Sequence, residues 1–377
     1  MTDILVHENP IRLGEKRTTT QDTHIPVHLP QLFVLFLSEN PVVNPHYEEV
    51  RKESEEWLAN ECSFDERSRR ILNKTDFSYF CSIAAPDAGP EELRTVCDWG
   101  NWVFPFDDMF DNGGLKDDPA RAQQLIDSLL AGMQDEGAHP SEAESSLVRV
   151  HNTVWQRIAQ ASPVGMHNPE PSSYITHAAY IGVRRRFAAS MGDYCKGSIE
   201  QVRTCSMGRY PSLDEMLALR RQSAGVAPLF ALVEYAHKLD IPDHVFECRS
   251  IKEIERIGVD LVLLQNDILS YCKEEKEGVA HNVVAICRHS GMPAQMAFNH
   301  IGNMLVARYK DWYLALAELP SWGEHVDAQV QQYIRGVQNV VMANLNWSFR
   351  SGRYFGDAKD IVRKSMIVTV KPQSPDV

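Results

Sequence analysis

Apolar residues recur through most of this chain at the three- and four-residue spacing that is typical of amphipathic helices. The longest such stripe comprises Ile251, Ile254, Ile257, Leu261, Leu264 and Ile268. Another begins after Pro90 and comprises Leu93, Val96, Cys97, Gly100 and Phe104. Residues four apart lie on the same face of a helix. Each stripe therefore predicts a helix with one face turned toward a core.

The same spacing predicts helices along most of the remaining chain. Asn44 followed by Pro45 is an N-cap with proline at the first helical position, so a helix is expected to begin there. The other expected helices are 119–133, 141–160, 172–195, 212–223, 226–238, 281–290, 293–319 and 325–347. A strand-like alternation of useful length occurs only from Met366 to Val370. The pattern predicts one all-α domain, with mobile ends.

Both long stripes run into a cluster of oxygen-bearing side chains. Asp107 and Asp111 end the first, and Asn266, Ser270 and Glu274 end the second. Because the members of each cluster are four residues apart, each cluster is expected on a single helix face. Carboxylate, amide and hydroxyl oxygens suit Mg²⁺, which commonly shares its coordination with water and a substrate phosphate. Two such faces opposite each other would hold several Mg²⁺ ions around a diphosphate.

The competing interpretation is that each cluster is an ordinary solvated acidic face, which is the more frequent reading of a lone DDxxD pattern. Two features argue against it here. Apolar residues, among them Phe106 and Phe110, flank the first cluster, and the second has the uncommon order N-D-x-x-S-x-x-x-E. Inward carboxylates without partners are costly to desolvate, so they would need cations.

Composition narrows the classes of function. The chain has 377 residues, 44% of them hydrophobic and 24% charged, which is ordinary for a globular protein. A net charge of -13 argues against nucleic acid as a partner and against an anionic membrane surface. Eight scattered cysteines without a CxxC pair indicate reduced thiols. We expect a cytoplasmic protein with no membrane span.

With these motifs the chain resembles the fungal class I terpene synthases of the sesquiterpene type. Members carry an aspartate-rich motif on one helix and an Asn-Ser-Glu triad on another. The resemblance implies that Asp107, Asp111, Asn266, Ser270 and Glu274 bind metal, with three Mg²⁺ ions gripping the substrate diphosphate. It also implies a single helical bundle around a central active-site cavity.

The resemblance covers about residues 28–357, which implies a terpene synthase domain over that range. Residues 1–27 would then be a mobile N-terminal segment and residues 358–377 a C-terminal tail. The resemblance leaves open whether the protein forms a homodimer.

Four more residues match family positions that contact the diphosphate. Arg220 stands upstream of Asn266 where the family has its diphosphate-sensing arginine, and Lys273 directly precedes Glu274. Arg353 and Tyr354 resemble the family's Arg-Tyr pair. The planar fork of arginine suits phosphate because it gives bidentate, charged hydrogen bonds. The plain alternative for Arg220 is a surface helix charge.

The matches around Arg220 extend to its neighbours on the C-terminal side. The resemblance implies that Ser223 links Arg220 to an effector carbonyl on Ala224, which a helix break at Gly225 would free. The adjacent Arg221 is expected to form a structural ion pair, and Arg184-Arg185-Arg186 a solvated or salt-bridged face.

The aromatic candidates for the lining of the pocket are Phe77, Phe80, Phe104 and Trp347. Phe104 and Trp347 would offer π faces to a carbocation. Core packing is the alternative for such residues, and the sequence leaves both readings open. The histidines show no metal-binding spacing and are interpreted as structural or surface groups.

The implied activity is Mg²⁺-dependent ionisation of farnesyl diphosphate, followed by cyclisation to a sesquiterpene hydrocarbon or alcohol and release of diphosphate. A helical prenyl diphosphate synthase would share the fold but would need a second aspartate-rich motif. Residues 260–275 carry the Asn-Ser-Glu triad in place of such a motif. A non-catalytic helical binding protein with a relic site is the third reading, and the complete set of candidate ligands argues against it. No DxDD motif is present, which argues against protonation-initiated cyclisation.

Overall fold

The computed structural model describes residues 24–134, 145–160 and 171–372, with side chains from residue 182 onward in the last range. The elements of the N-terminal half are β1 (Ile25–His28), η1 (Leu35–Ser38), α1 (Tyr47–Glu61), α2 (Glu66–Thr75), α3 (Phe77–Ala84), α4 (Pro90–Asp111), α5 (Pro119–Gln134), α6 (Ser146–Gln160) and α7 (Pro171–Ser206). Those of the C-terminal half are α8 (Leu213–Ser223), α9 (Val226–Ala236), α10 (Asp243–Phe246), α11 (Arg249–Glu277), α12 (Val283–His289), α13 (Ala294–Ala317), α14 (Glu324–Arg350), α15 (Gly352–Phe355), η2 (Gly356–Ala358), α16 (Lys359–Ser365) and β2 (Ile367–Val370). The expected all-α class is confirmed, with one short two-stranded sheet added to it.

Each helix expected from the apolar spacing is present. The largest difference in length is α7, which continues to Ser206, well past the expected end at residue 195. Residues 141–144 of the expected helix 141–160 lie outside the described residues.

The structure adds α2 and α3, which the spacing does not indicate. Helix α2 is mostly polar, and Leu72 is its one buried large apolar side chain. Helix α3 has the opposite composition, because it is an eight-residue run that is buried almost all round and has no polar face to mark its period. Asp76 joins the two helices in the left-handed conformation, at φ 47° and ψ 52°.

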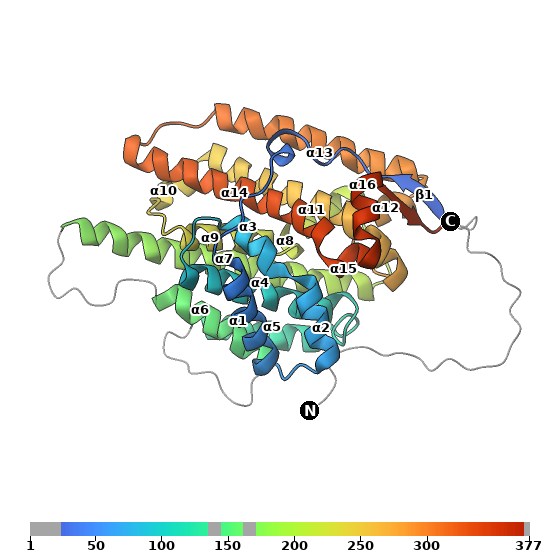
Figure 1. Cartoon of the computed structure of the whole chain (residues 1–377), viewed down its shortest axis with the longest axis horizontal. Helices are drawn as coiled ribbons and strands as arrows, with labels where there is room; N and C mark the ends of the chain where they lie inside the picture. The colour runs from blue at the N-terminus through green and yellow to red at the C-terminus, as the bar shows by residue number, and fades with distance from the viewer. Residues whose placement is uncertain (1–23, 135–144, 161–170, 373–377) are drawn as a thin grey trace, which may run out of the picture.

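Helix α11 runs through the interior of the molecule, where it packs against α13 and α14 (Figure 1). The predicted stripe from Ile251 to Ile268 is the buried side of this helix, and each of its members is at most 1% exposed. Helix α4 packs against α1 and α3, and α7 packs against α8 and α9. Burial of these faces accounts for most of what holds the bundle together, because helices in proteins are stabilised mainly by packing.

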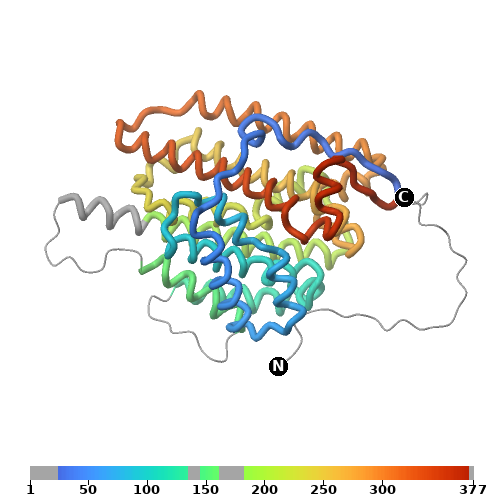
Figure 2. The backbone as a smooth tube through the Cα atoms, viewed as in Figure 1, coloured from blue at the N-terminus to red at the C-terminus, as the bar shows by residue number. Residues whose placement is uncertain are grey.

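The two strands bring the ends of the described chain together. β1 pairs with β2 in antiparallel register, with Ile25 opposite Val370 and His28 opposite Ile367. From β1 the chain crosses α13 and α14 before it descends to α1, as Figure 2 shows. Residues 25–28, 359–365 and 367–370 are thus in regular elements, although mobile ends were expected. The expected boundaries at residues 27 and 358 fall next to or inside packed structure, and the division into domains stays a prediction.

Two further expectations concern cysteines and membranes. All eight cysteines have free thiols. Among the described helices, none is both long and apolar enough to cross a bilayer.

Close packing between α9 and α14 gives a test of the fold. A Cβ added at Gly336 on α14 would lie 2.1 Å from Cγ1 of Val233 on α9. A Cβ at Gly192 on α7 would meet none of the described residues within 4 Å. We expect Gly336→Ala to lower the free energy of unfolding by about 1–3 kcal/mol, the usual effect of overpacking. The matched change Gly192→Ala should raise it by up to about 1 kcal/mol, because alanine favours the helix. Thermal denaturation of both variants measures the difference, and equal stability would contradict the α9–α14 contact.

Candidate active site

A hollow in the middle of the bundle is lined from α3, α4, α7, α8, α9, α11, α14 and α15. It brings together nearly all of the predicted site residues, although they come from distant parts of the sequence. Those lining it are Phe104, Asp107, Asp111, Arg220, Ser223, Ala224, Asn266, Lys273, Glu274, Trp347, Arg353 and Tyr354. Ser270 is the predicted residue that does not line this hollow, and its side chain is fully buried in α11.

The first oxygen-bearing face belongs to the last turns of α4. The Tyr194 hydroxyl donates to Oδ1 of Asp107 at 3.1 Å, and the Gln201 amide donates to Oδ1 of Asp111 at 2.5 Å, both from α7. Desolvation and the charge of Asp111 raise the pKa of Asp107 to about 8. Desolvation and the charge of Glu274 raise the pKa of Asp111 to about 6. Both carboxylates therefore lie where negative charge is disfavoured and a cation would be stabilising.

The second face belongs to α11. The amide of Asn266 donates to the hydroxyl of Tyr354 at 2.7 Å, and Glu274 accepts a hydrogen bond from the Asn282 amide at 2.8 Å. The pKa of Glu274 is raised by burial and by the charge of Asp267. Among the described residues, the buried hydroxyl of Ser270 has no hydrogen-bond partner. A buried polar atom left without a partner is costly, and a metal ligand is one explanation for it.

These oxygen donors fit a hard divalent cation by their chemical type. Within the described ranges, no three His, Cys, Asp or Glu side chains are close enough together to hold one metal ion. The donor set at the hollow is accordingly mixed, with amide and hydroxyl oxygens beside the carboxylates.

Arg220 is fixed against the second face. Its guanidinium donates to Oδ1 of Asp267 from Nη2 at 2.6 Å and from Nε at 3.1 Å, and to Oδ1 of Asn266 at 3.2 Å. Asp267 is itself held by the backbone N–H of Val283 at 2.7 Å. The guanidinium therefore stands beside the Asn266 end of the triad in one orientation.

Arg221, one residue on, points elsewhere. It pairs with Asp260 at 2.6 Å, a buried carboxylate that also pairs with Arg256 and Arg308. The predicted structural ion pair of Arg221 is present. Arg186, from the basic cluster at 184–186, pairs in the same structural way with Glu234 and Asp243.

The helix break predicted after Arg220 is present. Helix α8 ends at Ser223, and Gly225 adopts a φ of 65°, which favours glycine. The hydroxyl of Ser223 forms a 2.7 Å hydrogen bond with Nε2 of His281. His281 lines the hollow, where burial and then the charge of Arg220 lower its pKa well below the usual value. No pattern in the sequence singles out this histidine.

The Arg353–Tyr354 pair lies on the short helix α15 and contacts both acidic helices. Arg353 pairs with Asp108 of α4 at 2.8 Å, with its guanidinium 4.3 Å from the ring centre of Phe104. Tyr354 accepts its hydrogen bond from Asn266 of α11. Lys273 lines the hollow while pairing with Glu277 at 2.6 Å.

Aromatic rings form another wall of the hollow. Trp347 stacks on Phe104 with ring centres 5.3 Å apart, and meets Phe77 edge-on at 5.1 Å. Its indole N–H donates to the carbonyl of Thr75 at 2.6 Å. Trp347 is only 1% exposed, so it is a core residue as well as part of the lining.

Sequence reasoning missed several partners of these groups. Tyr194, Gln201, His281 and Asn282 hydrogen-bond the predicted residues from other segments. No motif marks them, because each becomes relevant only through tertiary packing. Asp267 is a further partner, and it differs from these four because it lies inside the second motif, directly after Asn266.

Comparison with known proteins shows the family of the chain. Residues 98–311, more than half of the chain, match the model of "Terpene synthase family 2, C-terminal metal binding". A silphinene synthase of Penicillium patulum is 40% identical over 94% of this chain and 91% of its own. A (+)-eremophilene synthase of Gibberella fujikuroi is 33% identical over 88% of each chain. The chain therefore belongs to the terpene synthase family, with a metal-binding domain, and is a class I terpene cyclase, a carbon–oxygen lyase.

Solved structures share the fold at lower sequence identity. α-Eudesmol synthase has a TM-score of 0.67 at 19% identity, covering 83% of this chain and 98% of the other. Hedycaryol synthase has a TM-score of 0.67 at 22% identity, covering 85% and 98%. The helical bundle expected for a class I terpene synthase is confirmed.

The electrostatics of Asp107 give a test that needs no turnover. A carboxyl whose pKa is raised from about 3.9 in the unfolded chain destabilises the fold increasingly as pH rises toward its folded value. That folded value is about 8 for Asp107. In EDTA, Asp107→Asn should therefore raise Tm, by an amount that grows from pH 5 to pH 8. Differential scanning fluorimetry measures this shift.

The control for Asp107 is Asp117, whose side chain is 74% exposed. Asp117→Asn should leave Tm nearly unchanged at every pH. Added Mg²⁺ should stabilise the unmodified protein more than the Asp107 variant. An Asp107→Asn protein that is less stable than the unmodified protein in EDTA at pH 8 would contradict the assignment of repulsion to this site.

Proposed function

We propose that the protein is a Mg²⁺-dependent sesquiterpene synthase that ionises farnesyl diphosphate and cyclises the resulting cation, releasing diphosphate. The observation that carries the proposal is the joint placement, around one hollow, of two oxygen-bearing helix faces, a set of cationic donors and an aromatic wall. The helix faces and the cationic donors suit a diphosphate, and the aromatic wall suits the hydrocarbon chain.

The leaving diphosphate would be held by the side chains at one end of the hollow. Arg220, Lys273 and Arg353 bring positive charge there, and Tyr354 adds a hydroxyl donor. Charge that grows on the leaving oxygen is stabilised best by donors already fixed in place. Arg220 and Arg353 meet that condition through their carboxylate partners Asp267 and Asp108.

The metal ligands would be Asp107 and Asp111 of α4 with Asn266, Ser270 and Glu274 of α11. Their fit rests on the carboxyl groups of Asp107 and Asp111, whose charged forms are disfavoured without a cation. Ser270 does not line the hollow, and its assignment rests on a buried hydroxyl that has no partner among the described residues. Bound Mg²⁺, for which we propose three ions, would supply charge that neutralises the diphosphate.

The cation that remains needs a dry surface without a nucleophile. Phe104 and Trp347 would line that surface with π faces. Ser223 and Ala224 lie at the break between α8 and α9, three and four residues after Arg220. Contact of Arg220 with diphosphate would reach the carbonyl of Ala224 through this short segment, as the effector role implies.

The names of relatives support a sesquiterpene product, since one relative at 30% identity is called "Sesquiterpene synthase 3". Another, 34% identical, is called an inactive guaia-6,10(14)-diene synthase, so turnover has to be measured. The solved linalool/nerolidol synthase holds 2-fluorogeranyl diphosphate. By analogy, we propose that a prenyl diphosphate binds in the hollow of this chain.

The decisive experiment offers geranyl, farnesyl and geranylgeranyl diphosphate side by side with Mg²⁺. We expect cyclic sesquiterpene and free diphosphate from farnesyl diphosphate, no turnover in EDTA, and recovery when Mg²⁺ is added back. Volatile products and diphosphate are both quantified. Undiminished diphosphate release in EDTA would overturn the metal assignment, and chain elongation with isopentenyl diphosphate would favour the prenyl diphosphate synthase.

The neighbouring arginines of α8 test the diphosphate site residue by residue. Arg220→Lys loses the planar fork beside Asn266, so kcat should fall by about 10²-fold, the usual size for a transition-state charge contact. Arg221→Lys changes an ion pair with Asp260 that lies outside the hollow, so kcat should change far less. Steady-state kinetics of both variants measure the two changes in kcat. An equal loss of kcat in both variants would show that the diphosphate contact is assigned to the wrong residue.

A further inference from the structure

The break between α2 and α3 contacts the C-terminal end of α14 through two consecutive residues, Thr75 and Asp76. The carbonyl of Thr75 accepts the indole N–H of Trp347 at 2.6 Å. The carboxylate of Asp76 pairs with Nε of Arg350 at 3.6 Å. Trp347 and Arg350 are three residues apart, so they lie on one face of α14. The helix is held at both positions by the same break.

Asp76 is a buried carboxylate with several polar partners. The residue is 7% exposed, and the hydroxyl of Tyr47 donates to its two carboxylate oxygens at 3.0 and 2.8 Å. Arg51 of α1 pairs with it at 3.3 Å. Burial raises the pKa of Asp76, and the partners Tyr47, Arg51 and Arg350 oppose that rise.

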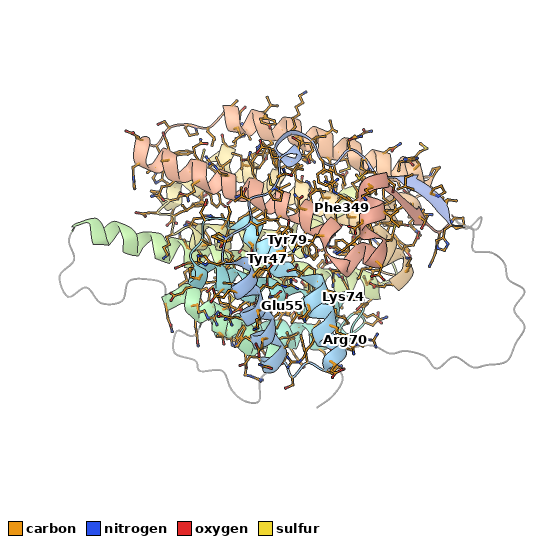
Figure 3. All side chains as sticks on the ribbon, in the orientation of Figure 1. Tyr47, Glu55, Arg70, Lys74, Tyr79 and Phe349 are labelled. Carbon is orange, nitrogen blue, oxygen red and sulfur yellow. The ribbon has the colours of Figure 1, made fainter. Side chains whose placement is uncertain are left out.

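The same cluster contacts the guanidinium of Arg350. That group lies 4.1 Å from the ring centre of Tyr79 on α3, and its Nη2 donates to the hydroxyl of Tyr47 at 3.3 Å. Tyr47 and Tyr79 meet edge-on at 5.7 Å, and Figure 3 shows the two side chains next to each other between α1 and α3. Three segments, α1, α3 and the end of α14, are thus joined around one carboxylate.

The segment proposed to grip diphosphate begins directly after Arg350. Ser351 caps α15 by accepting the N–H of Arg353 at 3.0 Å. Arg353 then pairs with Asp108, and Tyr354 pairs with Asn266. Only two residues separate Arg350 from Arg353, and three residue steps of extended chain span at most about 10 Å. A shift of the end of α14 therefore reaches both side chains directly.

We propose that Asp76 is a positioning residue that fixes the end of α14 through Arg350 and thereby sets the placement of Arg353 and Tyr354. Asp76 does not line the hollow. The inference rests on the proposed role of Arg353 and Tyr354 in holding diphosphate. The alternative is that the cluster only stabilises the fold.

The test is Asp76→Asn. Asparagine keeps the size of the side chain and tolerates the left-handed conformation of residue 76, so the change removes mainly the charge. The affinity for inorganic diphosphate in saturating Mg²⁺, measured by calorimetry, should fall about tenfold, an ordinary size for coupled neighbours. With farnesyl diphosphate, KM should rise and the product ratio should shift.

The matched control is Asp98→Asn. Asp98 is a fully buried carboxylate on α4 that pairs with Arg94 at 2.8 Å and Arg157 at 2.5 Å. Its loss should lower Tm as the loss of Asp76 does, but leave diphosphate affinity and product ratio unchanged. The proposal would be overturned if both variants lowered Tm equally and Asp76→Asn left the affinity for diphosphate unchanged.

A second variant protects the test against a folding failure. The side chain of Arg350 is 48% exposed, so Arg350→Gln is tolerated more readily than a change at Asp76. It should weaken diphosphate binding similarly, and the double variant should bind no more weakly than either single one. Additive losses, or unchanged binding in Arg350→Gln, would show that Asp76 does not act through Arg350.

Failure of the proposed function would look different. An unmodified protein that binds diphosphate with Mg²⁺ but converts no farnesyl diphosphate would contradict the function and leave the binding test intact. An unmodified protein that turns over normally while both variants bind diphosphate normally would contradict only the role of Asp76.

Discussion

Repulsion between carboxylates across the hollow is the constraint on which the rest of the site depends. Asp111 of α4 and Glu274 of α11 come close enough for the charge of Glu274 to raise the pKa of Asp111. Two neighbouring carboxylates in the same motifs, Asp108 and Asp267, each form an ion pair with an arginine. Across the described part of the chain, Asp107, Asp111 and Glu274 form no ion pair of their own. In each motif, one carboxylate thus fixes an arginine, and the other carboxylates leave their oxygen atoms open to the hollow.

Much of this arrangement could be predicted because the apolar period of a helix also fixes which polar residues share its inner face. On α4 the stripe that includes Phe104 turns Asp107 and Asp111 toward the hollow. On α11 the four-residue spacing places Asn266, Ser270 and Glu274 on one face, opposite Leu264 and Ile268. The separation of Arg220 from Arg221 follows from the same geometry, since adjacent residues of a helix point in different directions. Local spacing was sufficient wherever one long helix supplied the whole feature.

The remaining features depend on contacts between segments that no local pattern records. Helix α3 is buried almost all round, so it has no polar face from which a period could be read. The sequence did not single out His281 because its role arises only where the loop before α12 meets Ser223. Asp76 likewise looks like an ordinary polar residue until α1, α3 and α14 enclose it.

The pairing of β1 with β2 affects the order in which the molecule can be assembled. Val370 faces Ile25 across the ribbon, so almost the full length of the described chain must be in place before the strands can meet. Closing so long a loop costs more conformational entropy than any contact between neighbouring helices. During synthesis the first strand leaves the ribosome long before its partner, and Val27, 1% exposed in the finished fold, is uncovered throughout that interval. The ribbon is therefore expected to close last, after the bundle that it fastens has already formed.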